Sequence, residues 1–411
     1  TTEIYTSTPS SAASDVYKRQ SLFSQLLHHF PRTEFAHLVA KHQAERRAKG
    51  FTCWTQLVAM LFCHMARADS LREICGGLAC CQGKLRHLGI SKPPNKSTLS
   101  YANQHRPAEL FEELFWTMMH RFRSSGSLGN RKPKFRFKNK LLSLDSTTIS
   151  LCLSLFPWAK FRRAKGGVKV HVLLDHDDYM PSFALITEAK RHDRTVARRF
   201  TLKPGSIVAF DRAYNDYTLF SKWTDNGIYF VTRLKDNAVY RIMDNRSVPQ
   251  NRNILADQII QLTGQKAEEK CPHLLRRVVV WDEANNRIIS LLTNHLKFGA
   301  TTISAIYKDR WEIEIFFKTL KQHLKIKTFI GTSENALRIQ IWTALIALLL
   351  LKYLHHLSKF GWSLSNLATM LRLNLFTYRD LVKWIHDPFG QPPAPPTMQL
   401  SLPGFGQPLA G

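Results

Sequence analysis

The spacing of apolar residues changes once along this chain, near residue 126, and that change constrains the fold more than any other feature. Before it, apolar residues recur every three or four positions, as in "FTCWTQLVAMLFCHMA", which predicts a helical region over 21–125. After a basic linker, "GNRKPKFRFKNK", short runs such as "LLSLDSTT" and "SIVAFDRAY" predict strands. We therefore expect a helical domain followed by an α/β domain.

The second region divides further. We expect a first part of the α/β core over 126–234 and a mostly β insertion over 235–300, with strands in "LLRRVVVWD" and "RIISLLTN". The core then resumes over 301–387 with C-terminal helices. The apolar run "IWTALIALLLLKYL" is shorter than the ~20 residues that a bilayer requires, so it predicts a buried core helix and no membrane span.

The two ends of the chain lack a folding pattern. Residues 1–20 include "SAASDVYKRQ", which resembles a translated sequencing adapter, so we expect a non-native or disordered leader. The stretch 388–411 is rich in Pro and Gly and is expected to be a flexible tail.

The charge of the chain indicates a polyanionic partner. Lys and Arg total 58 against 31 acids, which gives a net charge of +27. Nucleic acid is the leading candidate, because the basic residues are spread along the chain and form no juxtamembrane block. Seven cysteines, an odd number, argue against a disulfide framework, and the cluster "CGGLACC" lacks the second ligand pair of a zinc site.

One part of the helical region suggests how DNA is bound. The breaker "SKPPNK" is followed by "STLSYANQHR", a short helix after a tight turn. This arrangement is compatible with a helix-turn-helix reader, and equally with a helical support domain that makes no base contacts.

Two acids each follow a run of strand-forming hydrophobes: Asp145 and Asp211. Such acids lie at the carboxyl ends of strands, where α/β sheets place their chemistry. If the strands are parallel neighbours, ~4.8 Å apart, the carboxylates converge, and a shared cation such as Mg²⁺ relieves their repulsion. Taken singly, either acid is better explained as a turn former or a helix cap.

A third acid is selected by helical geometry in "YKDRWEIEIFFKTLK". At about 100° per residue, Tyr307, Arg310, Glu314 and Lys321 fall within a stripe of about 60° along the edge of the apolar face. Glu312 and Asp309 miss that row, so Glu314 is the preferred partner of the two strand acids. A solvated charged face is the alternative explanation of the row.

The pattern Y-x2-R-x3-E-x6-K, after Asp145 in "LDSTT" and Asp211 in "FDRAY", resembles the signature of the insertion-sequence-4 (IS4) family of bacterial transposases. The resemblance extends from about Leu22 to Leu357. It implies an RNase H-like catalytic domain with an interrupting β insertion and an accessory helical domain. It further implies two Mg²⁺ ions, replaceable by Mn²⁺, held by Asp145, Asp211 and Glu314 for DNA cleavage and strand transfer.

The resemblance also implies partners. These are double-stranded DNA, as transposon ends and target, and a second copy in a synaptic homodimer, acting at the nucleoid in the bacterial cytoplasm. Tyr307, Arg310 and Lys321 are expected to grip phosphates near the cut. Trp311 is expected either to stack on a flipped base or to be a core or rim residue.

Another basic segment, "KFRRAKGG", is a candidate phosphate-gripping loop with glycine hinges, and equally a solvated face; its basic residues are Lys160, Arg162, Arg163 and Lys165. Two other functions remain open. A structure-selective nuclease on the same fold shares the three acids, and a transposase-derived protein that binds DNA without cutting it shares the charge.

Overall fold

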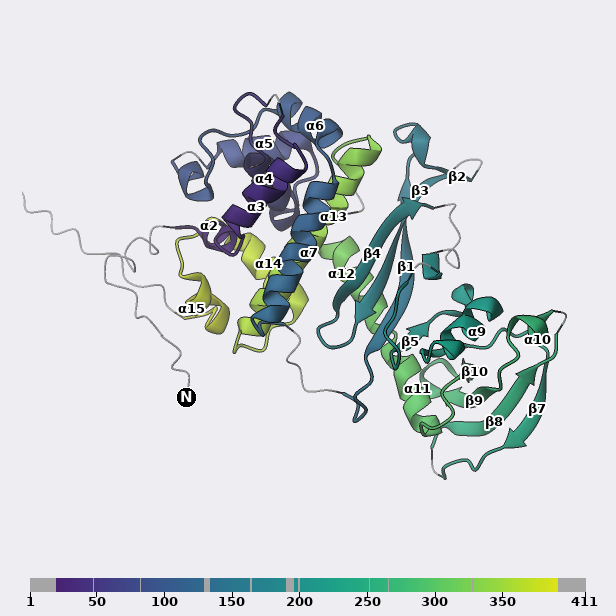
Figure 1. The fold of residues 1–411 in the computed structure, drawn as a ribbon. Coiled ribbons are helices and arrows are strands. Elements are labelled where there is room, and N and C mark those ends of the chain that lie inside the picture. The colour runs from purple at the N-terminus through teal and green to yellow at the C-terminus, as the bar shows by residue number, and fades with distance from the viewer. Residues whose placement is uncertain are drawn as a thin grey trace, which may run out of the picture.

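The computed structural model of the chain describes most of its length (Figure 1). The described residues are 20–46, 48–81, 83–128, 134–162, 165–189, 196–198, 200–250, 252–264, 266–324, 326 and 329–390, with the backbone alone for 160–162 and 165. The predictions for residues 1–19 and 391–411 therefore lie outside the described part of the chain.

Helices from the two ends of the chain form one body, seen in Figure 1 as the purple, blue and yellow-green helices packed together. Its N-terminal members are α2 (Leu22–Leu27), α3 (Arg32–Lys41), α4 (Cys53–Ala66), α5 (Leu71–Ala79), α6 (Lys96–His105) and α7 (Glu109–Ser124). Its C-terminal members are α13 (Glu334–Leu357), α14 (Leu364–Leu373) and α15 (Leu381–His386). The ends are also joined by backbone: Leu22 N donates to Thr377 O at 3.1 Å and Phe23 N to Leu375 O at 2.9 Å.

Helix α13 is the centre of this body. It packs against α4, α6, α7 and α14, and its residues from Ile339 to Leu351 are all buried. Among the described residues it is the one helix long and apolar enough to cross a membrane, and 83% of its apolar window is buried inside the protein. The sequence prediction of a buried core helix here is confirmed.

The strands begin at Leu141, after the helices, as the change in apolar spacing predicts. The described residues form one mixed sheet in the order β2-β3-β1-β5-β6-β10-β9-β8-β7, with β4 on β3. Its strands are β1 (Leu141–Leu151), β2 (Lys160–Arg162), β3 (Lys165–Asp175), β4 (Met180–Glu188), β5 (Ile207–Phe210), β6 (Tyr229–Arg233), β7 (Tyr240–Asn245), β8 (Ile254–Leu262), β9 (Leu275–Asp282) and β10 (Arg287–Thr293). The neighbours β1, β5 and β6 are parallel.

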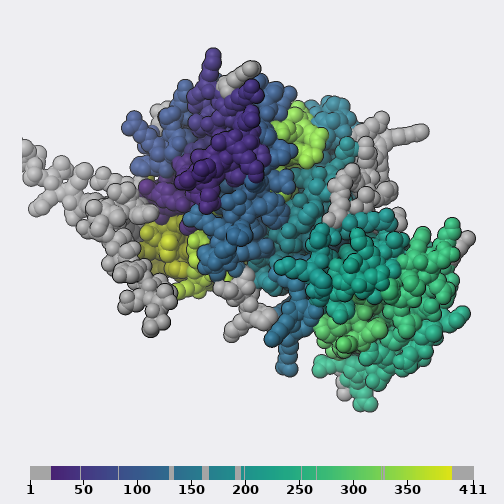
Figure 2. Space-filling view, in the orientation of Figure 1, coloured from purple at the N-terminus to yellow at the C-terminus, as the bar shows by residue number. Residues whose placement is uncertain are grey.

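The strands within 235–300 continue the same sheet, because β10 pairs antiparallel with β6. The predicted strands of this segment are present as β9 and β10. In Figure 2 this segment lies in the green lobe, and teal residues lie between it and the purple helical body. A buried ion pair stabilises it: Arg276 Nη2 lies 2.7 Å from Asp257 Oδ2, with side chains 1% and 4% exposed.

Two consecutive helices lead from the insertion back to the helical body (Figure 1). Helix α11 (Ala300–Asp309) buries Ile303 and Ile306 on β5, β6, β9 and β10. Helix α12 (Glu312–His323) buries Ile313 and Phe317 in the core that β1 shares with the helical body. The junction of α11 and α12 therefore lies where the sheet meets the helices. On the opposite face of the sheet, α9 (Tyr217–Asp225) buries Phe220 and Trp223.

Candidate active site

Asp145 lies on β1, and Asp211 directly follows β5, the neighbouring parallel strand. Leu144 of β1 is opposite Phe210 of β5 in the register, so each acid is the next residue after this matched pair. Strand β5 ends there because Asp211 caps the short helix Arg212–Tyr214, its carboxylate accepting from Ala213 N at 3.0 Å. This cap is the structural role that the sequence left open for a single acid.

Asp145 is not at the end of its strand, which corrects the sequence prediction. β1 continues to Leu151 because its outer half pairs with β3, where Ile149 is opposite Val168. What ends near Asp145 is the parallel pairing with β5. The acid therefore lies at the edge of the parallel sheet, on a strand that continues past it.

The environment of Asp145 disfavours its charged form. Its side chain is 20% exposed, and burial raises its pKa from 3.8 to about 6. The negative charges of Glu314 and Asp211 act in the same direction, whereas Arg310 and the Ser146 N–H, which donates at 2.7 Å, oppose the shift. The Asp145 carboxylate is therefore within electrostatic reach of the other two acids, although the chain provides the three from different elements.

Arg310 lies between two of these acids. Its Nη2 donates to Glu314 Oε1 at 3.0 Å, and its Nη1 lies 3.8 Å from Asp145 Oδ2. The Arg310 side chain is 8% exposed, and its Cζ lies 5.5 Å from the centre of the Tyr307 ring. Burial also raises the pKa of the Tyr307 hydroxyl, with Arg310 opposing. Tyr307, Arg310 and Glu314 thus face the Asp145 strand together.

The predicted single helix through this row is interrupted, which is a second correction. α11 ends at Asp309 and α12 begins at Glu312, and the hydrogen bonds Ile313 N to Arg310 O and Glu314 N to Trp311 O span three residues. A turn this tight is typical of 3₁₀ geometry. Arg310 and Trp311 keep right-handed helical backbone angles, so Tyr307, Arg310 and Glu314 stay on one side of the chain across this turn.

Lys321, at the far end of the predicted row, reaches β1. Its Nζ donates to Thr148 O at 3.1 Å, and this bond is exposed to solvent. It therefore lies along the outer half of β1, beyond Asp145.

Residues 136–350, more than half of the chain, match the family described as "Transposase DDE domain". The chain belongs to the DDE transposase family. Residues 18–91 match a domain of unknown function, DUF4372. The described helices of that segment, α2 to α5, belong to the helical body.

Curated relatives agree. A putative transposase of Sinorhizobium fredii, y4zB, is 32% identical over 75% of this chain and 85% of its own. A probable transposase for insertion sequence element IS5377 of Geobacillus stearothermophilus is 32% identical over 54% of this chain and 59% of its own. A putative transposase for element IS4SA of Synechocystis is 25% identical over 71% of this chain. The protein is therefore an insertion-sequence transposase, an enzyme that cleaves DNA and transfers strands.

One solved structure was also similar. The piggyBac transposase synaptic complex with hairpin DNA aligns with 92% of this chain and 82% of its own, at 10% identity and a TM-score of 0.43.

Trp311 of this transposase is 59% exposed, so it is not a core residue. It directly follows Arg310 at the junction of α11 and α12. The sequence left open a base-stacking role and a core or rim role. With the core role excluded, an exposed indole beside the acids suits either a rim residue or a base-stacking residue.

The basic segment 160–165 is a hairpin where it is described, and not a loop with glycine hinges. Lys160 is opposite Gly166 and Arg162 opposite Lys165, in β2 and β3. A Cβ on Gly166 would lie 3.1 Å from Leu151 O, so this glycine permits close approach of β3 to β1. Arg163 lies outside the described residues.

A second set of polar residues, which sequence reasoning missed, borders Asp211. A hollow of about 520 Å³ is lined by Asp211, Arg212, Ala213, Lys235, Asp236 and Asn237. Arg212 Nη1 pairs with Asp236 Oδ2 at 2.7 Å across it. Arg233 at the end of β6 acts electrostatically on Tyr307. Arg233 follows the strand-forming run "IYFVT", just as Asp145 and Asp211 follow runs of strand-forming residues, so the same pattern could have found it.

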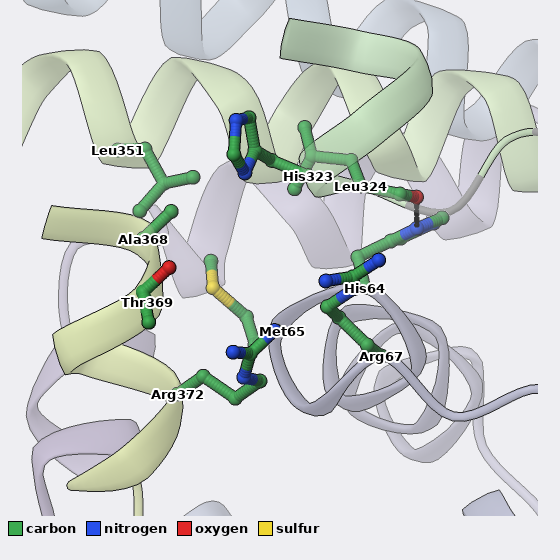
Figure 3. A pocket seen from close by; sticks show the side chains of 9 residues that line it. All are labelled: His64, Met65, Arg67, His323, Leu324, Leu351, Ala368, Thr369 and Arg372. Carbon is green, nitrogen blue, oxygen red and sulfur yellow. Dashed lines mark hydrogen bonds between the residues drawn. The ribbon is translucent and has the colours of Figure 1, made fainter. Parts of the chain in front are cut away.

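The far end of α12 is anchored in the helical body, as Figure 3 shows. His64 of α4 bonds Leu324 O through Nδ1 at 2.7 Å, drawn as a dashed line, and Thr343 of α13 through Nε2 at 3.0 Å. Burial lowers the pKa of His64 to about 4, so the ring is neutral. The adjoining hollow, which includes Arg67, His323 and Arg372, has about 10 Å³ and holds at most one water.

A divalent cation suits the chemistry of the three acids. DDE transposase domains are generally dependent on divalent metal. Carboxylate oxygens are the ligands that Mg²⁺ and Mn²⁺ take. Burial is the main cause of the raised pKa of Asp145, and the negative charges of Glu314 and Asp211, which a cation would offset, add to it. Within the described residues, no three His, Cys, Asp or Glu side chains are close enough to hold one ion together.

Proposed function

We propose that Asp145, Asp211 and Glu314 are the catalytic acids of an IS4-type transposase with an RNase H-like core. The observation that carries this proposal is the position of Arg310, which contacts both Asp145 and Glu314 while Asp211 occupies the matching position on the next strand. A parallel β1-β5-β6 centre bordered by antiparallel β3 supports the RNase H-like assignment.

The same three acids would hold two Mg²⁺ ions, or Mn²⁺ in their place. Bound there, these ions would supply Lewis acidity at the scissile phosphodiester and at its attacking and leaving oxygens. The partly buried carboxylate of Asp145 accepts from Ser146 N, and the capping carboxylate of Asp211 accepts from Ala213 N, so both have one oxygen oriented by a hydrogen bond. Glu314 is 37% exposed and is oriented by Arg310.

The basic and aromatic residues at and near the junction of α11 and α12 would bind the DNA. Arg310, Tyr307 and Lys321 are suited to hold DNA phosphates beside the acids, and these contacts fix position and not sequence. The exposed indole of Trp311 is available to stack on a base at the cut end. The net charge of +27 favours binding of the DNA phosphate backbone.

We further propose that the protein acts as a homodimer on paired transposon ends at the bacterial nucleoid, with the helical body as its accessory DNA-binding part. A size measurement with and without end DNA tests the dimer. A single copy in the DNA complex would contradict it.

The catalytic assignment is tested with Asp145→Ala, Asp211→Ala and Glu314→Ala in one assay of end cleavage and strand transfer with Mg²⁺. Each is expected to abolish both reactions while end binding is retained. Glu312→Ala, a neighbouring acid of the same helix, is the matched control and is expected to remain active. Cleavage by any one of the three variants would remove that residue from the site. Cleavage without strand transfer by the unsubstituted protein would favour the nuclease alternative.

A further inference from the structure

Asp309 is buried at the end of α11, one residue before Arg310, and both of its carboxylate oxygens are used. Oδ2 accepts from His176 Nδ1 at 2.6 Å, and Oδ1 pairs with Lys134 of the linker before β1. The Asp309 side chain is 2% exposed. These bonds to His176 and Lys134 lower its pKa against the opposing effect of burial, so it is ionised. Asp309 is therefore unavailable as a metal ligand, in agreement with its exclusion from the sequence row.

The hydrogen bonds continue from Asp309 to the strand of Asp145. Because the carboxylate only accepts, His176 Nδ1 donates to it, and His176 Nε2 is hydrogen-bonded to Ser143 Oγ at 2.7 Å. His176 is itself fixed to β1, since its N–H donates to Leu141 O at 3.1 Å. Ser143 lies two residues before Asp145, so both side chains are on the same face of β1.

The order Ser143, His176, Asp309 matches that of a hydrolase triad, but the burial excludes that function. Ser143 is 0% exposed and is paired on both sides, with Leu174 of β3 and Ala209 of β5. No substrate reaches its hydroxyl. The chain of bonds instead ties two parts of the site together, the strand of Asp145 and the helix junction of Arg310 and Glu314.

We propose that Ser143, His176 and Asp309 are positioning residues that set where Arg310 and Glu314 lie over Asp145. This inference rests on the catalytic assignment proposed above. The apolar residues Ile303 and Ile306 pack the end of α11 against the sheet. The bonds of Asp309 to His176 and Lys134, and of His176 to Ser143, add directional constraints on the orientation of the chain at the residue before Arg310.

The test is Asp309→Asn in the full-length protein, compared with Asp257→Asn. Both changes remove the charge of a buried carboxylate that has a cationic partner, but Asp257 lies in the insertion, away from the acids. Three quantities are measured: thermal unfolding, end-DNA affinity, and the single-turnover cleavage rate per folded molecule at saturating enzyme. A calorimetric Mn²⁺ titration without DNA adds a readout independent of turnover.

Both variants are expected to unfold at lower temperature. Asp309→Asn alone is expected to lower the cleavage rate and the Mn²⁺ affinity, each by about tenfold or more, as loss of an outer partner of a site typically does. End-DNA affinity is expected to change by less than about twofold, because most of the 58 basic residues of the chain lie outside this junction. Equal rates per folded molecule in Asp309→Asn and the unsubstituted protein would overturn the proposal.

Two further variants keep the outcome interpretable. Ser143→Ala removes only the outer bond and is expected to fold, with a cleavage rate between those of the unsubstituted protein and Asp309→Asn. If Asp309→Asn does not fold, an unchanged rate in Ser143→Ala overturns the proposal. Asp145→Ala is assayed in parallel: if it cleaves, the catalytic assignment is wrong, and if it does not while Asp309→Asn is fully active, only the positioning role is wrong.

Discussion

Arg310 and Glu314 form an ion pair one helical turn apart, with Nη2 3.0 Å from Oε1, and the same guanidinium lies 3.8 Å from Asp145. Pairs at this spacing on an exposed helix stabilise by only about 0.2–0.5 kcal/mol. Here the arginine side chain is 8% exposed and joins a helix to a strand. Because its charge is largely removed from water, loss of a carboxylate partner would leave a buried charge without full compensation. Arg310 therefore links α12 to β1 and is not a surface cation.

The first prediction concerns Arg310→Lys. An ammonium cannot reach both carboxylates in the fork geometry of a guanidinium, so Glu314 is expected to lose its orientation while the charge is kept. The single-turnover cleavage rate is expected to fall by about tenfold or more, which corresponds to about 1.4 kcal/mol. The matched control is Arg338→Lys, in the exposed pair with Glu334 of α13, where no change in rate is expected. A normal rate in Arg310→Lys would mean that the positive charge alone is sufficient.

The second prediction concerns pH and Asp145. Burial raises the pKa of this carboxyl from 3.8 to about 6, so its contribution to stability is fully present below pH 3.8 and is lost as the pH rises through 6. In metal-free protein, Asp145→Asn should therefore increase the free energy of unfolding at pH 7.5, by about 3 kcal/mol at most. The gain should shrink toward pH 4. Urea unfolding of both proteins across this range measures the difference, and a gain that is the same at every pH would contradict the raised pKa.

The third prediction concerns Trp311. Because its indole is 59% exposed, Trp311→Ala is expected to change the free energy of unfolding by less than about 0.5 kcal/mol. If the indole stacks on a base at the cut end, the affinity for pre-cut ends should weaken by about 1–3 kcal/mol. Trp311→Phe should recover most of the loss. Equal affinity in all three proteins would leave Trp311 as a rim residue.

The elements of this fold were predictable because their signals are local. The apolar spacing located the change from helices to strands, and the strand-end acids and the row Tyr307, Arg310, Glu314 were visible in short windows. In the structure, Asp145 and Glu314 both contact Arg310, so the row does face the strand of Asp145. The catalytic roles of these residues remain predictions.

What the sequence could not provide depends on contacts between distant segments. β1 runs past Asp145 because β3 pairs with its outer half. The helix divides at Arg310 beside Asp309, whose partners His176 and Lys134 are 133 and 175 residues away. No local pattern indicates either partner. Likewise, the apolar run of α13 predicts burial but does not indicate that the N-terminal helices are what it packs against.

The last prediction concerns the linker before β1, where basic and aromatic residues alternate. Phe135 and Phe137 are half-buried, with Phe137 stacked on Phe298 at 4.9 Å between ring centres, whereas Arg136 and Lys138 are exposed. The aromatic anchors hold the two cations toward solvent, and Lys134 joins the same linker to Asp309 beside the acids. Arg136 and Lys138 are therefore expected to contact DNA phosphates.

Each phosphate contact releases counterions, which adds about 0.9 to the slope of log affinity against log salt concentration. The double change Arg136→Gln and Lys138→Gln should lower that slope by about 2. Lys140→Gln is the matched control, because Lys140 is already neutralised by Asp175 at 2.7 Å and Asp177 at 2.5 Å. Filter binding of end DNA over a range of salt concentrations measures the slope. A slope unchanged in the double variant would remove the linker from the DNA-binding surface.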